Sequence, residues 1–125
     1  MRLLLDTNIL IRMLEEPHRL PGQVRDLLDD MDNALVVTTV SLVEIAIKVG
    51  TGKLAMPDDL LARLGALECE ILPVHPHHAM RMAQLPVVHR DPFDRLIVAQ
   101  ALAEDLMLVI SDRLLAGYGV AVIQA

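Results

Sequence analysis

Short apolar runs of strand length alternate with helix-patterned segments along this 125-residue chain, and that alternation restricts its fold more than any other feature. The strand-like runs are RLLL, LVVT, EILPV, MLVI and AVIQ, at residues 2–5, 35–38, 70–74, 107–110 and 121–124. Helices placed between consecutive strands are typical of parallel sheets with right-handed crossovers. The sequence therefore predicts a single three-layer α/β/α domain, residues 1–125, around a central, mainly parallel sheet of four to five strands.

The segments between these runs have helical spacing of their apolar residues. Helices are predicted at residues 7–16, 23–31, 41–50, 58–68, 77–85 and 92–104. In the second helix, Leu27, Leu28 and Met31 are expected to share one face. Gly50 is expected to close the third helix as a left-handed cap, and the Asp-Asp pair at residues 58–59 to start the fourth.

The composition supports an aliphatic core in a reducing compartment. Phe93 and Tyr118 are the only aromatic residues, and aliphatic side chains suit helices packed on a buried parallel sheet. Cys69 is the only cysteine, so no internal disulfide can form. The chain starts directly with a strand-like run, and no apolar segment reaches membrane-spanning length. We therefore expect a cytoplasmic protein without a membrane association.

The net charge of −6 excludes one broad way of holding nucleic acid. Domains that bind nucleic acid through bulk electrostatics are usually basic, and single-strand binders usually stack bases on aromatic side chains. Any activity on nucleic acid must therefore come from a local site. The excess negative charge also suits a basic protein partner.

Four acids fall at places where a parallel α/β protein forms its sites. Asp6 follows the first predicted strand and Asp112 the fourth, while Glu44 lies one turn into the helix after the second strand. Asp94 lies in the first turn of the helix that leads into the fourth strand. Ligands of such folds bind beyond the carboxyl ends of the strands, where the strand order reverses. The four carboxylates are therefore expected to converge.

Each of these acids also has an ordinary structural interpretation. Asp6 and Asp112 could cap the helices that follow them, because aspartate is a preferred N-cap residue. Residues 41–44, SLVE, match a capping box, in which Glu44 would reach back to the backbone of Ser41. Taken singly, the structural role is the more common one.

In the stretch HRDPFDR, residues 89–95, one acid is expected to cap a helix and the other to belong to the site. Asp91 has the cap position and Pro92 the first helical position, so the Asp91 side chain should accept a backbone N–H of the first turn. The Asp94 carboxylate is then left to point into the cleft. Asp91→Asn is accordingly expected to retain most activity, and Asp94→Asn to abolish it.

Together, the four acids indicate a metal site. Carboxylates brought together repel, and their pKa values rise unless a positive charge lies among them. Mg²⁺ or Mn²⁺ meets that need, because hard cations prefer oxygen ligands and usually retain waters. Such a cation lowers the pKa of a bound water and stabilises charge on a leaving oxygen, which suits hydrolysis of a phosphodiester.

Four motifs in register resemble the PIN domain: LLLDTNIL, SLVEIAIKVGTGKL, HRDPFDRLIVAQAL and LVISDRLLAGYGV. More narrowly, they are similar to the VapC toxins of type II toxin–antitoxin systems, and the resemblance covers essentially the whole chain. It implies a Mg²⁺- or Mn²⁺-dependent endoribonuclease that hydrolyses RNA by metal-activated water. It also implies a homodimer, with which the apolar first two helices are compatible, and inhibition by a cognate VapB-type antitoxin.

The resemblance assigns roles to individual residues. The metal-binding and catalytic acids of the family correspond to Asp6, Glu44, Asp94 and Asp112. The polar residues expected to support them are Thr7, Asn8 and Ser111. Asn8 is a departure, because many relatives carry histidine at this position.

Three basic residues lie beside the candidate ligands: Lys48, Arg95 and Arg113. They could contact an RNA phosphate or pair with neighbouring acids in the metal-free pocket. The histidine-rich HPHH at residues 75–78, with Cys69 upstream, fits no standard zinc finger, and a helix start is the favoured interpretation.

Two other functions are compatible with the same fold. A non-catalytic PIN-fold module would act through a partner, but a degenerate copy is expected to have lost one of the acids. A structure-specific DNA nuclease of the flap type would need further helical regions to grip a duplex, for which 125 residues are too few.

Overall fold

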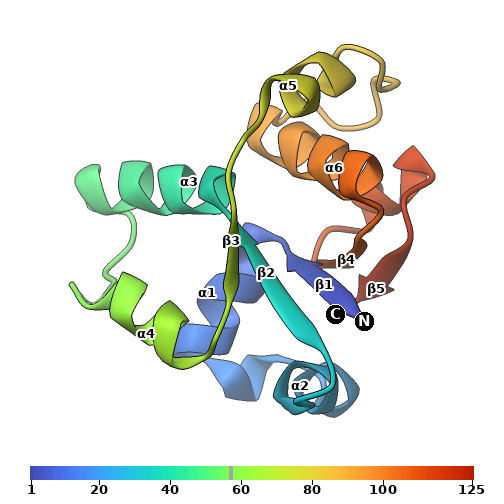
Figure 1. Ribbon diagram of the computed structural model, residues 1–125. Helices are drawn as coiled ribbons and strands as arrows, with labels where there is room; N and C mark the ends of the chain where they lie inside the picture. Colours follow the sequence, from blue (N-terminus) through green and yellow to red (C-terminus); the bar gives the residue numbers. More distant parts are fainter. Residues whose placement is uncertain (57) are drawn as a thin grey trace.

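The computed structural model describes residues 1–56 and 58–125. A five-stranded, all-parallel sheet with the strand order β3-β2-β1-β4-β5 forms its centre, and helices cover both faces (Figure 1). The predicted three-layer α/β/α fold is confirmed, with five strands that all run in parallel. The strands are β1 (Arg2–Leu5), β2 (Ala34–Thr38), β3 (Glu70–Leu72), β4 (Met107–Ile110) and β5 (Val122–Gln124).

The helices follow the predicted order, and some are shorter than predicted. They are α1 (Thr7–Glu15), α2 (Gly22–Asp29), α3 (Thr39–Gly50), α4 (Leu60–Ala66), α5 (Pro76–Met82) and α6 (Pro92–Glu104), with 3₁₀ turns η1 (Pro17–Arg19) and η2 (Arg113–Tyr118). The bounds of α6 and β4 agree with the sequence prediction, whereas α2 and α5 each end earlier. None of these helices in the described part of the chain is long and apolar enough to cross a membrane.

The central strand β1 separates two hydrophobic cores. Leu4 points to the face covered by α5, α6 and η2, where Ile97 and Leu115 pack against the sheet. Leu3 and Leu5 point to the opposite face, covered by α1, α2 and α4. Side chains alternate across a strand, so a strand buried on both faces is apolar throughout, as RLLL is after its first residue.

Helix α3 begins earlier than its sequence pattern suggests, so the capping-box alternative for Glu44 and the predicted left-handed cap at Gly50 are both wrong. Thr38, the last residue of β2, is its N-cap and accepts the backbone N–H of Val40 at 3.0 Å. Ser41 therefore lies inside the helix, so no capping box ties Glu44 to the helix start. Gly50 is the last helical residue, and the left-handed glycine of this turn is Gly52, with φ 74°.

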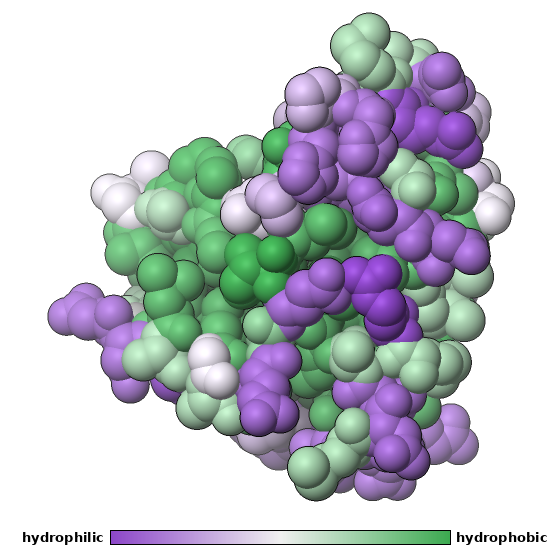
Figure 2. Space-filling view, in the orientation of Figure 1, coloured by the Kyte–Doolittle hydropathy of each residue, from purple (hydrophilic) through white to green (hydrophobic). Residues whose placement is uncertain are grey.

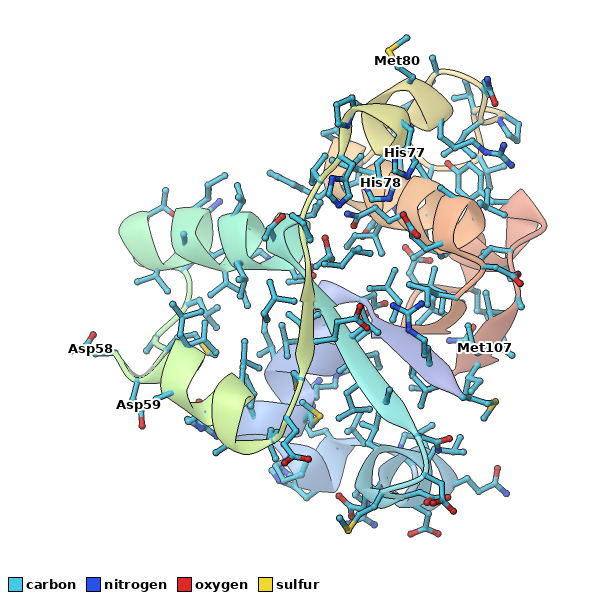
Figure 3. All side chains as sticks on the ribbon, viewed as in Figure 1. Asp58, Asp59, His77, His78, Met80 and Met107 are labelled. Carbon is cyan, nitrogen blue, oxygen red and sulfur yellow. The ribbon has the colours of Figure 1, made fainter. Side chains whose placement is uncertain are left out.

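The second helix corrects a further expectation, because it ends before Met31, whereas the fourth starts at the Asp-Asp pair as predicted. In α2 the core-facing pair is Val24 and Leu28, whereas Met31 lies beyond the helix end and is 95% exposed. Residue Asp59 is the N-cap of α4 but makes no side-chain cap hydrogen bond. Figure 3 shows Asp58 and Asp59 pointing into solvent at the edge of the molecule.

Candidate metal centre

The candidate site lies where the strand order reverses. The chain proceeds outward from β1 through β2 to β3, and then returns to the other side of β1 as β4 and β5. The carboxyl ends of β2, β1 and β4 are therefore adjacent, and the residues after them are Thr39, Asp6 and Ser111. The backbone N–H of Asp6 donates to the carbonyl of Val109 at 3.0 Å, which joins β1 and β4 at this edge.

Asp6 is both a helix cap and a bridge between strand ends. Its carboxylate is 3% exposed; Oδ1 accepts the backbone N–H of Ile9 at 2.8 Å and Oδ2 accepts that of Ser111 at 2.8 Å. Burial raises the pKa of Asp6, although the hydrogen bonds from Ile9 and Ser111 oppose this rise. Oδ2 also accepts the Ser111 hydroxyl at 3.3 Å, whereas Oδ1 keeps a second lone pair, so the cap role leaves Asp6 able to bind a cation through Oδ1.

The two acids of HRDPFDR have different surroundings. Asp91 is the N-cap of α6, and its Oδ1 accepts the backbone N–H of Phe93 at 2.8 Å. Asp94, one turn later, has its pKa raised to about 6, first by burial and then by the negative charges of Asp91, Glu44 and Asp6, against a lowering by His89. Glu44 and Asp6, from other elements, are near enough for their charges to raise the pKa of Asp94.

His89 joins two of the acids and was not identified from the sequence. Its Nε2 lies 3.0 Å from Asp112 Oδ2 and 3.5 Å from Asp94 Oδ2. One atom from each of these three residues lies within 4.8 Å of the others, a spacing that could hold an ion. The other oxygen of Asp112 accepts the backbone N–H of Leu114 at 3.0 Å. The position of His89 two residues before the cap of α6 was the available signal.

Glu44 carries the clearest sign of a missing positive charge. Its Oε1 is buried and has no hydrogen-bond partner among the described residues. Its Oε2 lies 3.3 Å from Lys48 Nζ, one helical turn further along α3. A buried carboxylate oxygen without a donor is costly, and cation coordination is one way to satisfy it.

The supporting polar residues link the elements around the acids. Thr7 Oγ1 donates to Ser41 Oγ at 2.9 Å, and both residues are buried. Asn8 Nδ2 donates to Ser111 Oγ at 3.4 Å. The role of Ser41 was missed because the sequence pattern placed it at a helix cap rather than inside α3.

The basic residues beside the acids differ in their contacts. Arg95 donates to the carbonyl oxygens of Pro86 at 2.9 Å and Met82 at 3.3 Å, so its guanidinium holds the loop before α6. Lys48 pairs with Glu44, and Arg113 is exposed at the start of η2. Contacts of these three residues with an RNA phosphate stay predictions.

A second cluster of titratable side chains joins α5 to α6. His78 is fully buried; its Nδ1 accepts the backbone N–H of His75 at 3.0 Å, so its Nε2 carries the proton and points to Glu104 Oε1 at 2.7 Å. His77 lies 3.1 Å from the same oxygen, and hydrogen bonds from His78 and His77 lower the pKa of Glu104 (Figure 3). Because both ring nitrogens of His78 are engaged, this cluster is an interhelical clamp rather than a zinc site.

The donor set of the acid cluster fits a hard divalent cation. Asp6, Glu44, Asp94 and Asp112 offer carboxylate oxygens, which Mg²⁺ and Mn²⁺ prefer. Glu44 Oε1 has no hydrogen-bond partner in the described part of the chain, and burial with neighbouring negative charges raises the pKa of Asp94, so a cation would be favoured beside both carboxylates.

The fold and these carboxylates define a parallel α/β protein with an acidic site at its switch point. The chain belongs to the PIN domain family, whose profile matches residues 3–119. No curated protein matched the chain. Nucleases of this family typically use divalent metal ions.

Solved structures share the fold over nearly the whole chain. VapBC2 from Rickettsia felis, bound to a DNA fragment from its promoter, is 18% identical with a TM-score of 0.73, over 99% of this chain and 98% of that one. DNA-bound VapBC from Salmonella typhimurium is 21% identical with a TM-score of 0.73, and the match covers 99% of this chain and 98% of that one. VapBC-5 of Mycobacterium tuberculosis, a member of the VapBC family of toxin–antitoxin systems, is 28% identical with a TM-score of 0.57. The match covers 98% of this chain and 96% of that one.

Proposed function

We propose that this protein is a VapC-type toxin of a type II toxin–antitoxin system and acts as a Mg²⁺- or Mn²⁺-dependent endoribonuclease in the cytoplasm. The observation that carries the proposal is a buried Glu44 oxygen, without a hydrogen-bond partner among the described residues, whose carboxylate raises the pKa of Asp94 at the switch point of a PIN fold. The 28% identity to VapBC-5 over nearly both full chains supports the toxin assignment.

The proposed ligands are Asp6, Glu44, Asp94 and Asp112, directly or through water. When bound, the cation would supply an activated water and stabilise charge on the leaving oxygen of the RNA phosphodiester. Asp6 is the most rigid of the four, since backbone N–H groups of Ile9 and Ser111 fix both of its oxygens. No side chain is required as a covalent nucleophile.

Basic residues at the rim would meet the RNA backbone locally. Lys48 is beside Glu44 and Arg113 is exposed next to Asp112, so either could contact a phosphate once a cation has neutralised the acids. The net charge of −6 provides no general attraction for RNA, so binding should depend on this local site.

We also infer a homodimer and a VapB-type antitoxin as protein partners. Apolar side chains of α1 and α2 pack in the core. Exposed apolar side chains come instead from α3, α4 and the β3 region, and Figure 2 shows hydrophobic surface gathered over this side of the molecule. They are Val43, Ile47, Val49, Leu61, Ile71 and Val74.

The proposed activity is tested with purified protein freed from any antitoxin. The protein is incubated with a broad RNA panel and with single- and double-stranded DNA, in Mg²⁺, Mn²⁺ or EDTA. Cleavage of RNA that requires the metal and leaves 5′-phosphate ends is expected, and Asp94→Asn serves as the inactive control. Cleavage of DNA alone would indicate a DNA nuclease, and no metal-dependent cleavage of any substrate would favour a non-catalytic module.

A further inference from the structure

His89 is fixed beside the acid cluster through its own backbone. Its N–H donates to the hydroxyl of Tyr118 at 2.7 Å, and its carbonyl accepts from the same hydroxyl at 3.1 Å. Tyr118 is buried in η2, and Arg95 also donates to its hydroxyl at 3.3 Å. The loop before α6 is thereby tied to the segment that follows β4, which carries Asp112.

The orientation of the His89 ring follows from its hydrogen bonds. Nδ1 accepts the backbone N–H of Asp91 at 3.0 Å, so this nitrogen presents a lone pair. The proton of the neutral ring is then on Nε2, which faces Asp112 Oδ2 at 3.0 Å and Asp94 Oδ2 at 3.5 Å. In this tautomer His89 donates to the carboxylate of Asp112 and has no free nitrogen with which to bind a cation.

We propose that His89 is a positioning residue whose Nε2–H holds the carboxylate of Asp112 in the orientation in which it binds the divalent cation. This inference rests on the metal site of the proposed function. Carboxylate ligands of metal ions are commonly oriented by hydrogen bonds from groups that do not touch the ion.

Asp112 has the greatest need of such support. Its side chain is 41% exposed, so without contacts it would sample several rotamers. The Leu114 N–H fixes one oxygen and the His89 Nε2–H the other, which leaves one lone pair on each for the cation. The same nitrogen lies 3.5 Å from Asp94 Oδ2, so the His89 ring lies between the carboxylate on α6 and the carboxylate that follows β4.

Two substitutions separate this role from a purely structural one. His89→Asn can place its amide oxygen near the Nδ1 position and keep the bond from Asp91 N–H, but it does not reach the acids. His89→Gln can place an amide N–H near the Nε2 position but offers no acceptor at Nδ1. His89→Asn therefore keeps the hydrogen bond from Asp91 N–H and loses the Nε2–H donor. His89→Gln keeps a donor near the Nε2 position and loses the bond from Asp91 N–H.

Binding of Mn²⁺ alone, without RNA, is measured by calorimetry and by the EPR signal of free Mn²⁺, together with the melting temperature of each metal-free protein. We expect His89→Asn to bind Mn²⁺ about 10- to 100-fold more weakly with little change in melting temperature. His89→Gln should bind Mn²⁺ nearly as the wild type does, although its melting temperature should fall.

The outcomes distinguish this inference from the proposed function. If the wild type binds no Mn²⁺, the metal site itself is wrong and the role of His89 fails with it. If the wild type binds and His89→Asn binds equally well or more tightly, only the role of His89 is overturned. Equal losses in both variants would also overturn it, because the glutamine donor would then have failed to replace Nε2–H.

Discussion

Asp94→Asn should make the metal-free protein more stable while it removes the proposed activity. The Asp94 side chain is 22% exposed, and its pKa is raised from 3.8 to about 6, chiefly by burial. Above pH 6 the folded protein therefore holds a carboxylate that would be better solvated in the unfolded chain. At about 1.4 kcal/mol for each unit of pKa, the ionised group costs the folded state up to about 3 kcal/mol.

The pH dependence has a definite sign. Between pH 4 and 6 the folded state retains a proton on Asp94 that the unfolded state has lost, so the contribution of this group to stability falls as pH rises. Below pH 4 both states are protonated and the penalty is absent; above pH 6 it is complete. The advantage of Asp94→Asn should therefore be largest near pH 7 and should vanish near pH 4.

Urea unfolding in EDTA, followed by circular dichroism at several pH values, measures this difference. Asp58→Asn is the matched control, since it removes one negative charge from an exposed position away from the site. Saturating Mg²⁺ or Mn²⁺ should stabilise the wild type and the control much more than Asp94→Asn. If Asp94→Asn is no more stable than Asp58→Asn at pH 7, the acid cluster does not carry the electrostatic penalty inferred from the structure.

Three further changes test separate parts of the structure. Asp91→Asn should retain most RNA cleavage because asparagine can still cap α6, whereas Asp91→Ala should lower the free energy of unfolding by about 1 kcal/mol. An equal loss of cleavage in Asp91→Asn and Asp94→Asn would contradict the assignment of the cap to one acid and of the metal to the other. Thr7→Val removes the donor to buried Ser41 and should cost about 1–3 kcal/mol in urea unfolding, and an unchanged stability would show that this contact is unimportant. Ile47→Asp on α3 should convert the proposed dimer to a monomer, as measured by light scattering, whereas Met80→Asp, at another exposed apolar residue on α5, is the control. A dimer that persists in Ile47→Asp would exclude the α3 face as its interface.

Local sequence patterns were sufficient where the decisive interactions are local. The alternation of apolar runs with helical spacing determined the α/β class, because strand and helix periodicities arise from neighbouring residues. The cap at Asp91 depends on Phe93, two residues away, and was readable from DPFD. The sequence also placed acids after β1 and β4 and near the start of α6, since strand ends are visible as the ends of apolar runs.

The contacts that join distant elements were decided only by the tertiary structure. The Asp6 carboxylate bonds to Ser111, 105 positions away, and the His89 ring bonds to Asp112, 23 positions away. A capping box was the alternative interpretation for Glu44 because SLVE has the local pattern, but Thr38 at the end of β2 starts the helix, and Glu44 Oε1 has no partner among the described residues. Which donor meets which acid depends on the strand order, and that order follows from the packing of two cores against one sheet rather than from any short stretch of residues.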